Sequence, residues 1–455
     1  MNTKALRQKI LDLAIHGKLV PQDPNDEPAS VLLERIRAEK ERLIKEGKIK
    51  RPKKTNTTSD KPHYENVPFV VPSSWVWTTV GEISQSILYG VSESAKTQGT
   101  YRLLRITDIQ DNKVNWDTVP FTDYENEKAE AYLLKDGDIL FARTGATVGK
   151  SYLVNNLKEK AIYASYLIRV QTSHYVLPAF VKYFFESGFY WEQVLGNSVG
   201  IGQPNVNGTI LSNLELPIPP IMEQKRIVKE LGEWLSIIDK IEESKGRIQK
   251  VISLAKSKVL DLAIHGKLVP QDPTDEPASE LLKRINPKAE ITCDNGHYQK
   301  LPEGWAVCQL DSIISYEQPT PYIVKSTDYD NTYTTPVLTA GKSFIIGHTN
   351  ETNGIYEKLP CIIFDDFTTD SKLVDFPFKV KSSAMKILQV KEDINIEYIA
   401  MFMSITRLIG DTHKRYWISE YSKIEIPIPP QNEQDRIVKK VRLLLSRLDE
   451  IMENL

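Results

Sequence analysis

The segment of this sequence that comes nearest to a catalytic pattern is Gly145 to Ser151, which reads GATVGKS. A phosphate-binding loop has the spacing GxxxxGK[ST], in which glycines let the backbone amides surround a phosphate. The first glycine position is occupied here by Thr144, so the loop is one residue too short for this role. We therefore predict no nucleotide hydrolysis, and we expect the loop amides and Lys150 to contact a DNA phosphate instead.

Other motifs that would support catalysis or metal binding are missing from the sequence. It has no HExxH, GxSxG or EF-hand pattern, and no Asn/Asp-Pro-Pro-aromatic tetrapeptide of an amino-methyltransferase. Its cysteines, Cys293, Cys308 and Cys361, are too few and too scattered for a disulfide framework or a CxxC metal site. His16 and His265 each precede a glycine, and we interpret them as residues of a last helical turn rather than as catalysts or ligands. We thus expect this chain to bind no metal or cofactor.

Two segments of the sequence are duplicated, and we expect them to form the elements that position a functional site. Leu11–Ser30 (LDLAIHGKLVPQDPNDEPAS) recurs with one difference at Leu260–Ser279, 249 positions later. A looser pair is formed by Leu214–Leu231 and Ile424–Val441, 210 positions apart. Such near-identity predicts a duplicated module whose two copies meet the same partner surface. The chain therefore runs through the first segment, a variable block and the second segment, and then repeats this order.

The order of these repeats is cyclic. The 210-residue offset places Leu455 opposite Lys245, and the 249-residue offset places Met1 opposite Lys250. The middle of the chain therefore holds in one piece a segment that the two ends hold in two parts. If both copies fold alike, the termini lie close together and the molecule has a pseudo-twofold axis.

A heptad pattern begins at Ile227, because apolar residues recur from there in alternating steps of four and three. Over about 40 residues such a helix would form a rod roughly 60 Å long. We predict that it forms a coiled coil with the C-terminal copy; the alternative is an amphipathic helix on the core of its own domain. The predicted seam positions are Ile227, Leu231, Trp234, Ile238, Ile241, Ile248, Ile252, Ile437, Val441, Leu444, Leu448 and Ile451.

Each copy of the first segment predicts the end of a helix, a loop and a second helix. Gly17 and Gly266 suit the left-handed position after a helix, and Asp-Glu-Pro at 26–28 and 275–277 suits the start of the next one. In the first copy this helix is followed by the basic segment 48–54, KIKRPKK. That segment can be a solvated linker or an arm that contacts DNA.

The two variable blocks share their borders and their pattern of strands. They open with VPSSW at 71–75 and LPEGW at 301–305, and both end in PIPP. An aromatic helix is predicted near the end of each, over 177–195 and 394–408. The predicted strands are 103–109, 137–143 and 162–171 in the first block, and 335–340, 361–367 and 379–390 in the second. We expect two diverged copies of one α+β domain.

Composition sets wider bounds on function. A formal net charge of −2 argues against a protein that wraps nucleic acid unaided, but it allows a local basic surface. The first residues, MNTKALRQKI, lack the apolar core of a signal peptide, and no apolar run approaches the length of a membrane span. We expect a cytoplasmic protein that does not bind membranes.

The motifs together resemble the specificity subunits of type I restriction-modification systems over nearly the whole chain. The resemblance rests on LDLAIHGKLVPQ, on LLKDGDILFARTGATVGK at 133–150, on GIGQPNVNG at 200–208, on IIFDDFTTDSKLV at 362–374 and on both PIPPxxEQxRIV segments. It implies an α+β fold in which two related target-recognition domains are held apart by an antiparallel coiled coil of long conserved helices. The regions it implies are a conserved helical segment at 1–61, recognition domains at 62–220 and 297–430, a central helical region at 221–296 and a C-terminal helix at 431–455.

The resemblance also implies the partners of the chain. Each recognition domain would read one half of a bipartite site in double-stranded DNA, and the helices would dock two methyltransferase subunits. Those subunits would carry S-adenosylmethionine and the adenine-N6 chemistry, while motor-nuclease subunits would bring ATP and Mg. This chain would then be non-catalytic. The residues alone leave two alternatives. One is a coiled-coil scaffold that binds proteins and no DNA, and the other is a self-contained enzyme, which would need catalytic residues that the sequence does not contain.

Polar residues at strand ends and in loops are the candidates for DNA contact. Alignment of the strands sets Phe141 against Phe364, which places Arg143 opposite Asp366; an earlier strand places Arg105 opposite Thr339. Arginine suits the O6 and N7 acceptors of guanine and aspartate suits the amino group of cytosine, whereas the alternative for both is an internal salt bridge. The candidates are Arg105, Thr107, Arg143, Thr144, Thr147, Lys150, Gln203 and Asn205 in the first block, and Thr339, Lys342, Asp366, Thr368, Thr369, Lys372, Lys414 and Arg415 in the second.

Overall fold

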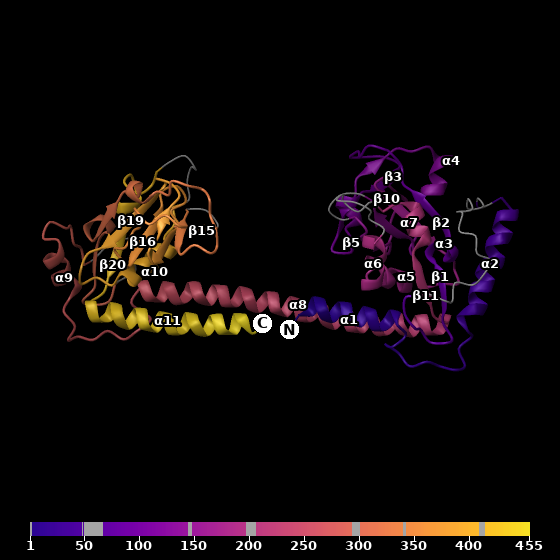
Figure 1. Cartoon of the computed structure of the whole chain (residues 1–455), viewed down its shortest axis with the longest axis horizontal. Coiled ribbons are helices and arrows are strands. Elements are labelled where there is room, and N and C mark those ends of the chain that lie inside the picture. Colours follow the sequence, from indigo (N-terminus) through magenta and orange to yellow (C-terminus); the bar gives the residue numbers. More distant parts are fainter. Residues whose placement is uncertain are drawn as a thin grey trace. The chain divides into compact units, whose positions relative to one another are not determined.

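The computed structural model describes residues 2–47, 49, 67–143, 148–196, 206–293, 301–339, 343–408 and 415–455 (Figure 1). It divides into two compact units, Met1–Ser244 and Lys245–Leu455. Each unit holds one copy of the LDLAIHGKLVPQ segment, one variable block and one PIPP segment with its helix. Both units combine helices with β-sheets, so the α+β class is confirmed.

The first unit contains two sheets of three or more strands beside its helices. A four-stranded antiparallel sheet has the order β2-β10-β7-β8, and a three-stranded sheet has the order β6-β3-β9. Its strands are β1 Val76–Thr79, β2 Ser84–Tyr89, β3 Tyr101–Leu104, β4 Ile109–Gln110, β5 Lys113–Val114, β6 Phe121–Thr122, β7 Ile139–Ala142, β8 Ser151–Leu153, β9 Ala161–Tyr163, β10 Leu167–Thr172 and β11 Glu215–Ile218. Its α-helices are α1 Thr3–Ile15, α2 Ala29–Lys45, α3 Val80–Ile83, α4 Asn126–Ala129, α5 Pro178–Phe184, α6 Gly188–Gly196, α7 Gly208–Asn213 and the first half of α8 Ile221–Ile264.

The second unit has the same kind of sheets. The order β13-β19-β16-β17 corresponds to the four-stranded sheet of the first unit, and β15-β14-β18 to the three-stranded one. Its strands are β12 Ala306–Gln309, β13 Ile314–Glu317, β14 Thr335–Leu338, β15 Ile345–Thr349, β16 Cys361–Asp365, β17 Ser371–Val374, β18 Lys379–Val380, β19 Met385–Val390 and β20 Glu425–Ile428. Its α-helices are the second half of α8, α9 Ala278–Ile285, α10 Ile396–Ile405 and α11 Gln431–Glu453.

Strand register confirms both alignments of the variable blocks. Phe141 lies opposite Ile168 and Ser151, and Phe364 lies opposite Lys386 and Ser371 in the corresponding strands. Arg143 and Asp366 therefore hold equivalent positions after β7 and β16.

The earlier strand agrees as well. The Ala164 amide donates to the Leu104 carbonyl at 2.9 Å, and the Lys381 amide donates to the Leu338 carbonyl at the same distance. These equivalent bonds make Arg105 the counterpart of Thr339.

Four predicted elements are each interrupted in the structure. The strand predicted over 103–109 ends with β3 at Leu104 and continues as a 3-10 helix at Ile106–Asp108 before β4. The stretch 162–171 crosses from β9 to β10, and 379–390 crosses from β18 to β19, so each contributes to two different sheets. The aromatic helix predicted over 177–195 is two helices, α5 and α6. The Ser187 hydroxyl donates to the Phe184 carbonyl at 2.7 Å and accepts from the Tyr190 amide at 3.3 Å, so it caps one helix and begins the next.

Gly17 and Gly266 end their helices in the left-handed conformation, with φ of +66° and +63°, as the sequence predicted. A Cβ atom on Gly17 would also lie 2.5 Å from Pro72 Cγ, and one on Gly266 would lie 2.3 Å from Pro302 Cγ. Glycine is therefore needed twice over, for the backbone turn and for the close approach of the variable block.

The two histidines take the role that we inferred for them. Nδ1 of His16 lies 2.6 Å from the Asp12 carbonyl oxygen, and Nδ1 of His265 lies 2.8 Å from that of Asp261. Each ring therefore bonds the last turn of its own helix.

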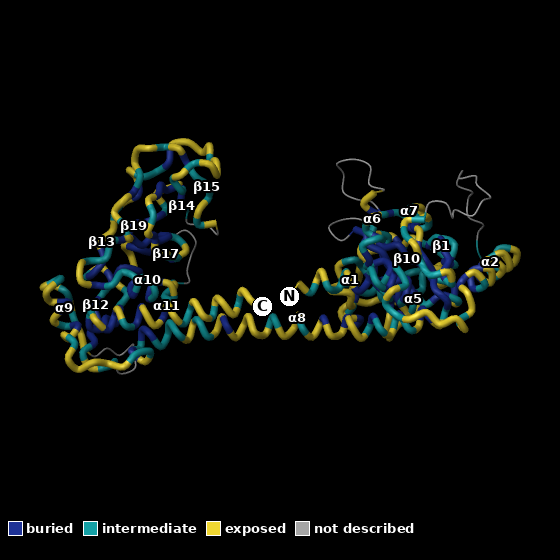
Figure 2. The backbone as a smooth tube through the Cα atoms, turned by 60° about the horizontal axis from the view of Figure 1, so that its bottom comes forward, coloured by how far each residue is buried: buried dark blue, intermediate teal, exposed yellow. Residues whose placement is uncertain are grey.

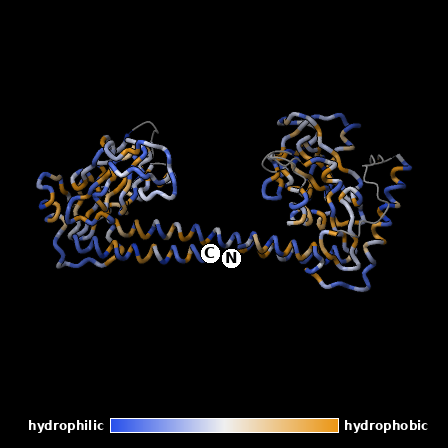
Figure 3. The backbone as a smooth tube through the Cα atoms, viewed as in Figure 1, coloured by the Kyte–Doolittle hydropathy of each residue, from blue (hydrophilic) through white to orange (hydrophobic). Residues whose placement is uncertain are grey.

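Within each unit the conserved helices run side by side in opposite directions. In the first unit Arg7 on α1 pairs with Asp239 on α8, and Gln22 after α1 bonds Glu223 near the start of α8. In the second unit α8 and α11 repeat this pattern through Lys256 with Asp449 and Gln271 with Glu433. Hydrophobic residues gather inside both units and alternate with hydrophilic ones along α8 (Figure 3).

The buried face of these helices also belongs to the core of the variable block. Ile227, Leu231 and Ile238 are fully buried in a cluster with residues of α1, β7 and α5, and Ile437 and Val441 are buried in the matching cluster of the second unit (Figure 2). The alternative of an amphipathic helix on its own domain thus describes each end of α8 and the start of α11. A coiled coil between the copies stays a prediction.

At three predicted seam positions the structure differs from the heptad pattern. Trp234, Ile248 and Ile451 keep 41%, 42% and 50% of their surface exposed. Leu235 takes the buried place beside Leu231, because a straight helix of 3.6 residues per turn brings a residue back to the same face after a step of four. The other seam positions are buried or half-buried.

None of the helices in the described part of the chain contains an apolar stretch that could span a lipid bilayer.

Candidate nucleic-acid interface

Arg143 lies at the end of β7 with its guanidinium group on an aromatic ring. The guanidinium carbon is 5.1 Å from the centroid of the Tyr89 ring, at the end of β2. The Tyr89 hydroxyl accepts a hydrogen bond from the Gly208 amide at 2.8 Å, and the Arg143 amide donates to the Tyr166 carbonyl at 3.0 Å. Tyr166 is 61% exposed. Within the described part of the chain, the Arg143 guanidinium has no hydrogen-bond acceptor, and its Nε is buried without a partner.

Asp366 holds the equivalent position in the second block, but its carboxylate is used internally. Its amide donates to the Ala384 carbonyl at 3.1 Å, as the Arg143 amide does to Tyr166. Oδ1 accepts from the Trp417 amide at 2.8 Å, and Oδ2 lies 3.5 Å from Nζ of Lys386. Asp366 and Lys386 are both only 2% exposed. The structure therefore corrects the prediction of a DNA contact at Asp366 in favour of the internal salt bridge.

Thr369 is also corrected, because it is fully buried. Its backbone has a φ of +58° and its hydroxyl accepts from the Leu408 amide at 3.1 Å. The neighbouring Thr368 is exposed, but its hydroxyl donates to Asp365 Oδ2 at 2.6 Å. These threonines shape the loop after β16 rather than extend from it.

Arg105 is half-exposed and already paired. Its guanidinium group bonds both carboxylate oxygens of Asp108, at 3.1 and 2.7 Å, across a short 3-10 helix at Ile106–Asp108. The hydrogen bond to Asp108 is the main cause that raises the pKa of Arg105. Thr107, between them, is exposed. This ion pair uses Nε and Nη2 of Arg105, and the group is therefore oriented by Asp108.

The remaining described candidates lie at the surface. Lys150 is exposed directly before β8. Thr339 is half-buried, and its amide donates to the Phe344 carbonyl at 2.9 Å. Lys372 is exposed with Nζ 4.4 Å from the centroid of the Phe344 ring, and exposed Arg415 has its guanidinium carbon 5.8 Å from that of Phe367.

Six candidates lie outside the described residues. They are Thr144, Thr147, Gln203, Asn205, Lys342 and Lys414. The basic residues 50–54 also lie outside them.

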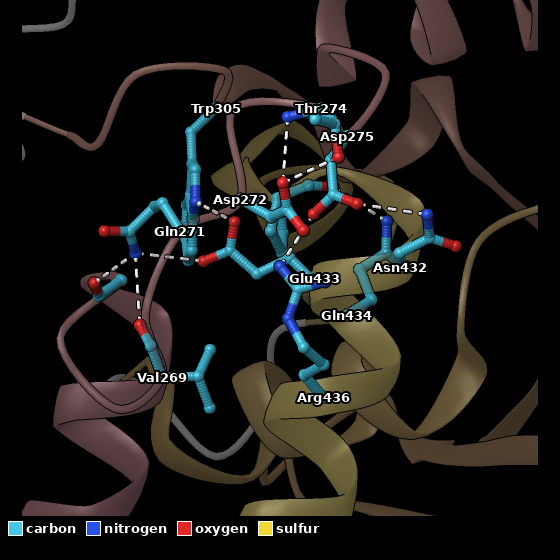
Figure 4. Close-up of polar contacts among 12 residues, drawn as sticks. Val269, Gln271, Asp272, Thr274, Asp275, Trp305, Asn432, Glu433, Gln434 and Arg436 are labelled. Atoms are coloured by element: carbon cyan, nitrogen blue, oxygen red, sulfur yellow. Dashed lines mark hydrogen bonds and ion pairs between the residues drawn. The ribbon is translucent and has the colours of Figure 1, made fainter.

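The two kinds of duplicated segment contact each other in the structure, which the sequence analysis did not predict. Glu433, from the second segment, is 1% exposed and accepts hydrogen bonds from Nε1 of Trp305 and Nε2 of Gln271, both at 3.1 Å (Figure 4). One turn later Arg436 pairs with Asp275 at 2.6 Å. Helix α11, the loop after α8 and the opening of the variable block are thereby joined at one buried carboxylate.

The first unit repeats this junction with its own residues. Glu223 is 1% exposed and accepts from Nε2 of Gln22 at 2.6 Å, and Arg226 pairs with Asp26 at 2.5 Å. Burial raises the pKa of both Glu223 and Glu433, and the bonds from Gln22 and Gln271 oppose this shift.

The glutamine beside each buried glutamate ties the junction to the variable block. The Gln224 side chain accepts from the Leu177 amide at 2.9 Å, and that of Gln434 accepts from the Asn395 amide at 2.8 Å. Each amide precedes the helix that follows the large sheet. The recurrence of Glu, Gln and Arg in both PIPPxxEQxRIV phrases was the signal that could have located these contacts.

Comparison with known proteins identifies the family of this chain. The family described as "Type I restriction modification DNA specificity domain" matches residues 72–251 and 302–455. The specificity subunit of the type I restriction enzyme EcoAI from Escherichia coli is 28% identical over 568 aligned positions, which cover 98% of this chain and 90% of that protein. The EcoR124I/EcoR124II specificity subunit from Escherichia coli is 50% identical over 147 residues, 30% of this chain and 36% of that protein.

Similarity of fold agrees with similarity of sequence. A solved chain from work on complex assembly and conformational transition of the type I R-M system has a TM-score of 0.56 at 15% identity, covering 85% of this chain and 94% of its own. Since the family covers more than half of the sequence, the chain belongs to the type I restriction-modification DNA specificity family. It is a DNA-recognition specificity subunit, and catalysis belongs to other subunits of such a system.

Proposed function

We propose that each variable block reads one half of a bipartite site in double-stranded DNA, and that the conserved segments of the two units dock two methyltransferase subunits. The observation that carries this proposal is a contrast between the junctions at Glu223 and Glu433, which are alike, and the ends of the two large sheets, which differ. The two junctions use Gln22 with Glu223 and Gln271 with Glu433 in the same way. At the end of the large sheet, however, equivalent positions hold Arg143 and Asp366. Junctions that are alike suit a constant partner. Arg143 has no acceptor among the described residues whereas Asp366 is buried, so the two sheet ends offer different groups to a ligand, as the reading of different DNA words requires.

Exposed apolar residues on α8 support the docking of a protein partner. Trp234 and Ile237 are 41% and 48% exposed in the first unit, and Val251 and Leu254 are 63% and 70% exposed in the second. Apolar side chains grouped on the surface of a helix favour association with another protein. A methyltransferase subunit of the same system is the partner that family membership favours, with S-adenosylmethionine in that subunit and ATP and Mg in motor-nuclease subunits that join later. We expect this complex to work on DNA in the cytoplasm.

The docking proposal is tested by stoichiometry. Light scattering of the chain co-expressed with its methyltransferase should give a mass of one copy with two methyltransferase subunits. A stable one-to-one complex under saturating methyltransferase would contradict docking on both units.

The readout proposal is tested by exchanging one block. Replacement of 297–430 by the equivalent block of a related subunit should change one half of the methylated site and leave the other half and the spacing intact. Methylated adenines in cells that express each complex would be mapped by sequencing. A scaffold without DNA would give no methylation that depends on this chain, and a change in both halves would contradict independent reading. The near-identical segments at Leu11 and Leu260 would also allow recombination to exchange blocks in nature.

A further inference from the structure

The corresponding ends of the two large sheets carry different residues. After β7 the side chain of Arg143 lies on Tyr89 and has no acceptor among the described residues. After β16 the equivalent Asp366 is buried and cannot extend to a ligand. An exposed cation at this end of the second sheet must therefore come from another segment.

Asp366 itself brings that segment to the sheet end. Its carbonyl accepts from the Tyr416 amide at 2.9 Å and its Oδ1 accepts from the Trp417 amide at 2.8 Å. These two bonds hold the residues directly after Arg415. The exposed Arg415 guanidinium then lies over the ring of Phe367, the residue that follows Asp366.

The ring of Phe367 is held in place by the loop that carries it. The Phe367 amide donates to Asp365 Oδ1 at 2.9 Å, and the Thr368 hydroxyl donates to Oδ2 of the same carboxylate at 2.6 Å. In the first block, the Tyr89 ring is fixed by its place in β2 opposite Ile168 and by the bond from the Gly208 amide. Both blocks therefore provide an anchored ring on which an arginine lies.

A ring under a guanidinium group covers one face and leaves the N–H donors at the edge. Those donors have the fork geometry that matches O6 and N7 of guanine in the major groove. The ring also limits the conformations of a long side chain, so less entropy is lost when a base is bound.

Stacking alone does not define such a site, as Arg102 demonstrates. Its guanidinium carbon is 3.9 Å from the centroid of the Phe121 ring, closer than in either pair above. However, its donors are occupied by Glu159 at 2.9 and 3.1 Å and by the Val119 carbonyl at 2.7 Å. Arg102 is therefore a structural residue and a matched control.

We infer that Arg143 on Tyr89 and Arg415 on Phe367 are the base-reading pairs of the two blocks, each specific for a guanine in its own half-site. The inference rests on the proposed function, in which the blocks read DNA. It adds that the base-reading arginine comes from different segments in the two blocks. In the first block it directly follows β7, and in the second it lies in the segment after α10. Asp366 is the positioning residue of the second pair.

The test uses the complex assembled with its methyltransferase and DNA sites that carry single base-pair changes. Arg143→Ala should lower discrimination at one guanine-containing pair of one half-site by about 5- to 150-fold, with the other half-site unaffected. Arg415→Ala should do the same in the other half-site only. Arg143→Lys and Arg415→Lys keep the charge, so they should lose the discrimination while affinity for non-specific DNA and its salt dependence stay near those of the wild type.

Two further sets of variants keep the test independent of folding. Arg102→Lys, and Arg407→Lys at the surface pair of Arg407 with Asp370, should read DNA as the wild type does. Tyr89→Leu should lower discrimination at the same base pair as Arg143→Ala. Tyr89→Phe keeps the ring in β2 and loses only the bond from the Gly208 amide, so it should lower discrimination less than Tyr89→Leu.

Two results would overturn the inference while the proposed function stands. One is a uniform loss of affinity for all sequences in Arg143→Ala, which would identify a phosphate contact. The other is unchanged discrimination in Arg143→Ala or Arg415→Ala. The proposed function itself would fail at an earlier step, if the wild-type complex bound all site variants equally.

Discussion

Glu433 is a carboxyl group whose burial makes the stability of the second unit depend on pH. Burial raises its pKa above the ordinary value of 4.5, so the folded state binds more protons than the unfolded state between the two values. The free energy of unfolding therefore falls as the pH rises from 4.5 through the folded pKa. We expect Glu433→Gln to reduce this fall, because the amide cannot ionise. Urea unfolding of both proteins over a series of pH values measures it.

The control for this prediction lies on the same helix. Glu450 is exposed on α11, so Glu450→Gln removes the same charge without a buried site. Its pH profile should follow that of the wild type. Parallel profiles for Glu433→Gln and wild type would mean that the buried carboxyl does not determine the pH dependence.

The indole of Trp305 is a second residue on which this junction depends. Its Nε1 donates to Glu433, so Trp305→Phe removes a donor from a buried carboxylate. The expected loss in the free energy of unfolding is about 1 to 3 kcal/mol. The same substitution in a Glu433→Gln background should cost less, because the acceptor is then neutral. Equal losses in both backgrounds, measured by urea unfolding, would contradict a role for the hydrogen bond.

Residue types and strand patterns were enough to place Arg143 at the end of a strand, but not to predict the ring on which it lies. Tyr89 reaches it because β2 and β7 both pair with β10, and pairing between distant strands is not written in local spacing. Asp366 was left between two interpretations for the same reason. Lys386 and Trp417 decide between them, and they approach only when β19 and the segment after α10 fold onto β16.

At the scale of elements, the sequence predicted that α8 has a buried apolar face, but it did not predict every residue of that face. Ile227, Leu231 and Ile238 follow from periodicity, and all are buried. Leu235 replaces Trp234 because the steps 227, 231 and 235 follow an ordinary helix beside a globular core. Heptad spacing alone does not distinguish this packing from a coiled coil.

Adjacent residues of α8 give a direct test of this register. Ile238 is fully buried and Ile237 is 48% exposed. Ile238→Lys places an unpaired charge in the core, so we expect the first unit to lose about 3 to 5 kcal/mol or to unfold. Ile237→Lys should change stability by about 0.5 kcal/mol or less. Thermal unfolding followed by circular dichroism measures both.

The same pair separates folding from assembly. Under the docking proposal Ile237→Lys should weaken the complex with the methyltransferase although the chain stays folded. A folded Ile237→Lys variant that binds the methyltransferase as the wild type does would remove Ile237 from the docking surface. An Ile238→Lys variant as stable as the wild type would overturn the assignment of the buried face.

At the scale of the whole molecule, the cyclic order of the repeats predicts that the chain can begin elsewhere. A short linker from Leu455 to Met1, with a new opening between Lys53 and Ser59, would restore the segment that the chain ends divide. We expect this permuted chain to be folded and to assemble with its methyltransferase, as measured by co-purification and light scattering. A folded permuted chain that fails to assemble would contradict the pseudo-twofold symmetry.

The matching junctions at Glu223 and Glu433 have a consequence for the order of assembly. If they present equal surfaces, the first methyltransferase has two places to choose from and the second has one. The two binding steps then differ only by this statistical factor, and half-assembled complexes are populated whenever methyltransferase is scarce. A larger difference between the steps would measure communication between the units, since it is a coupling free energy and acts in both directions.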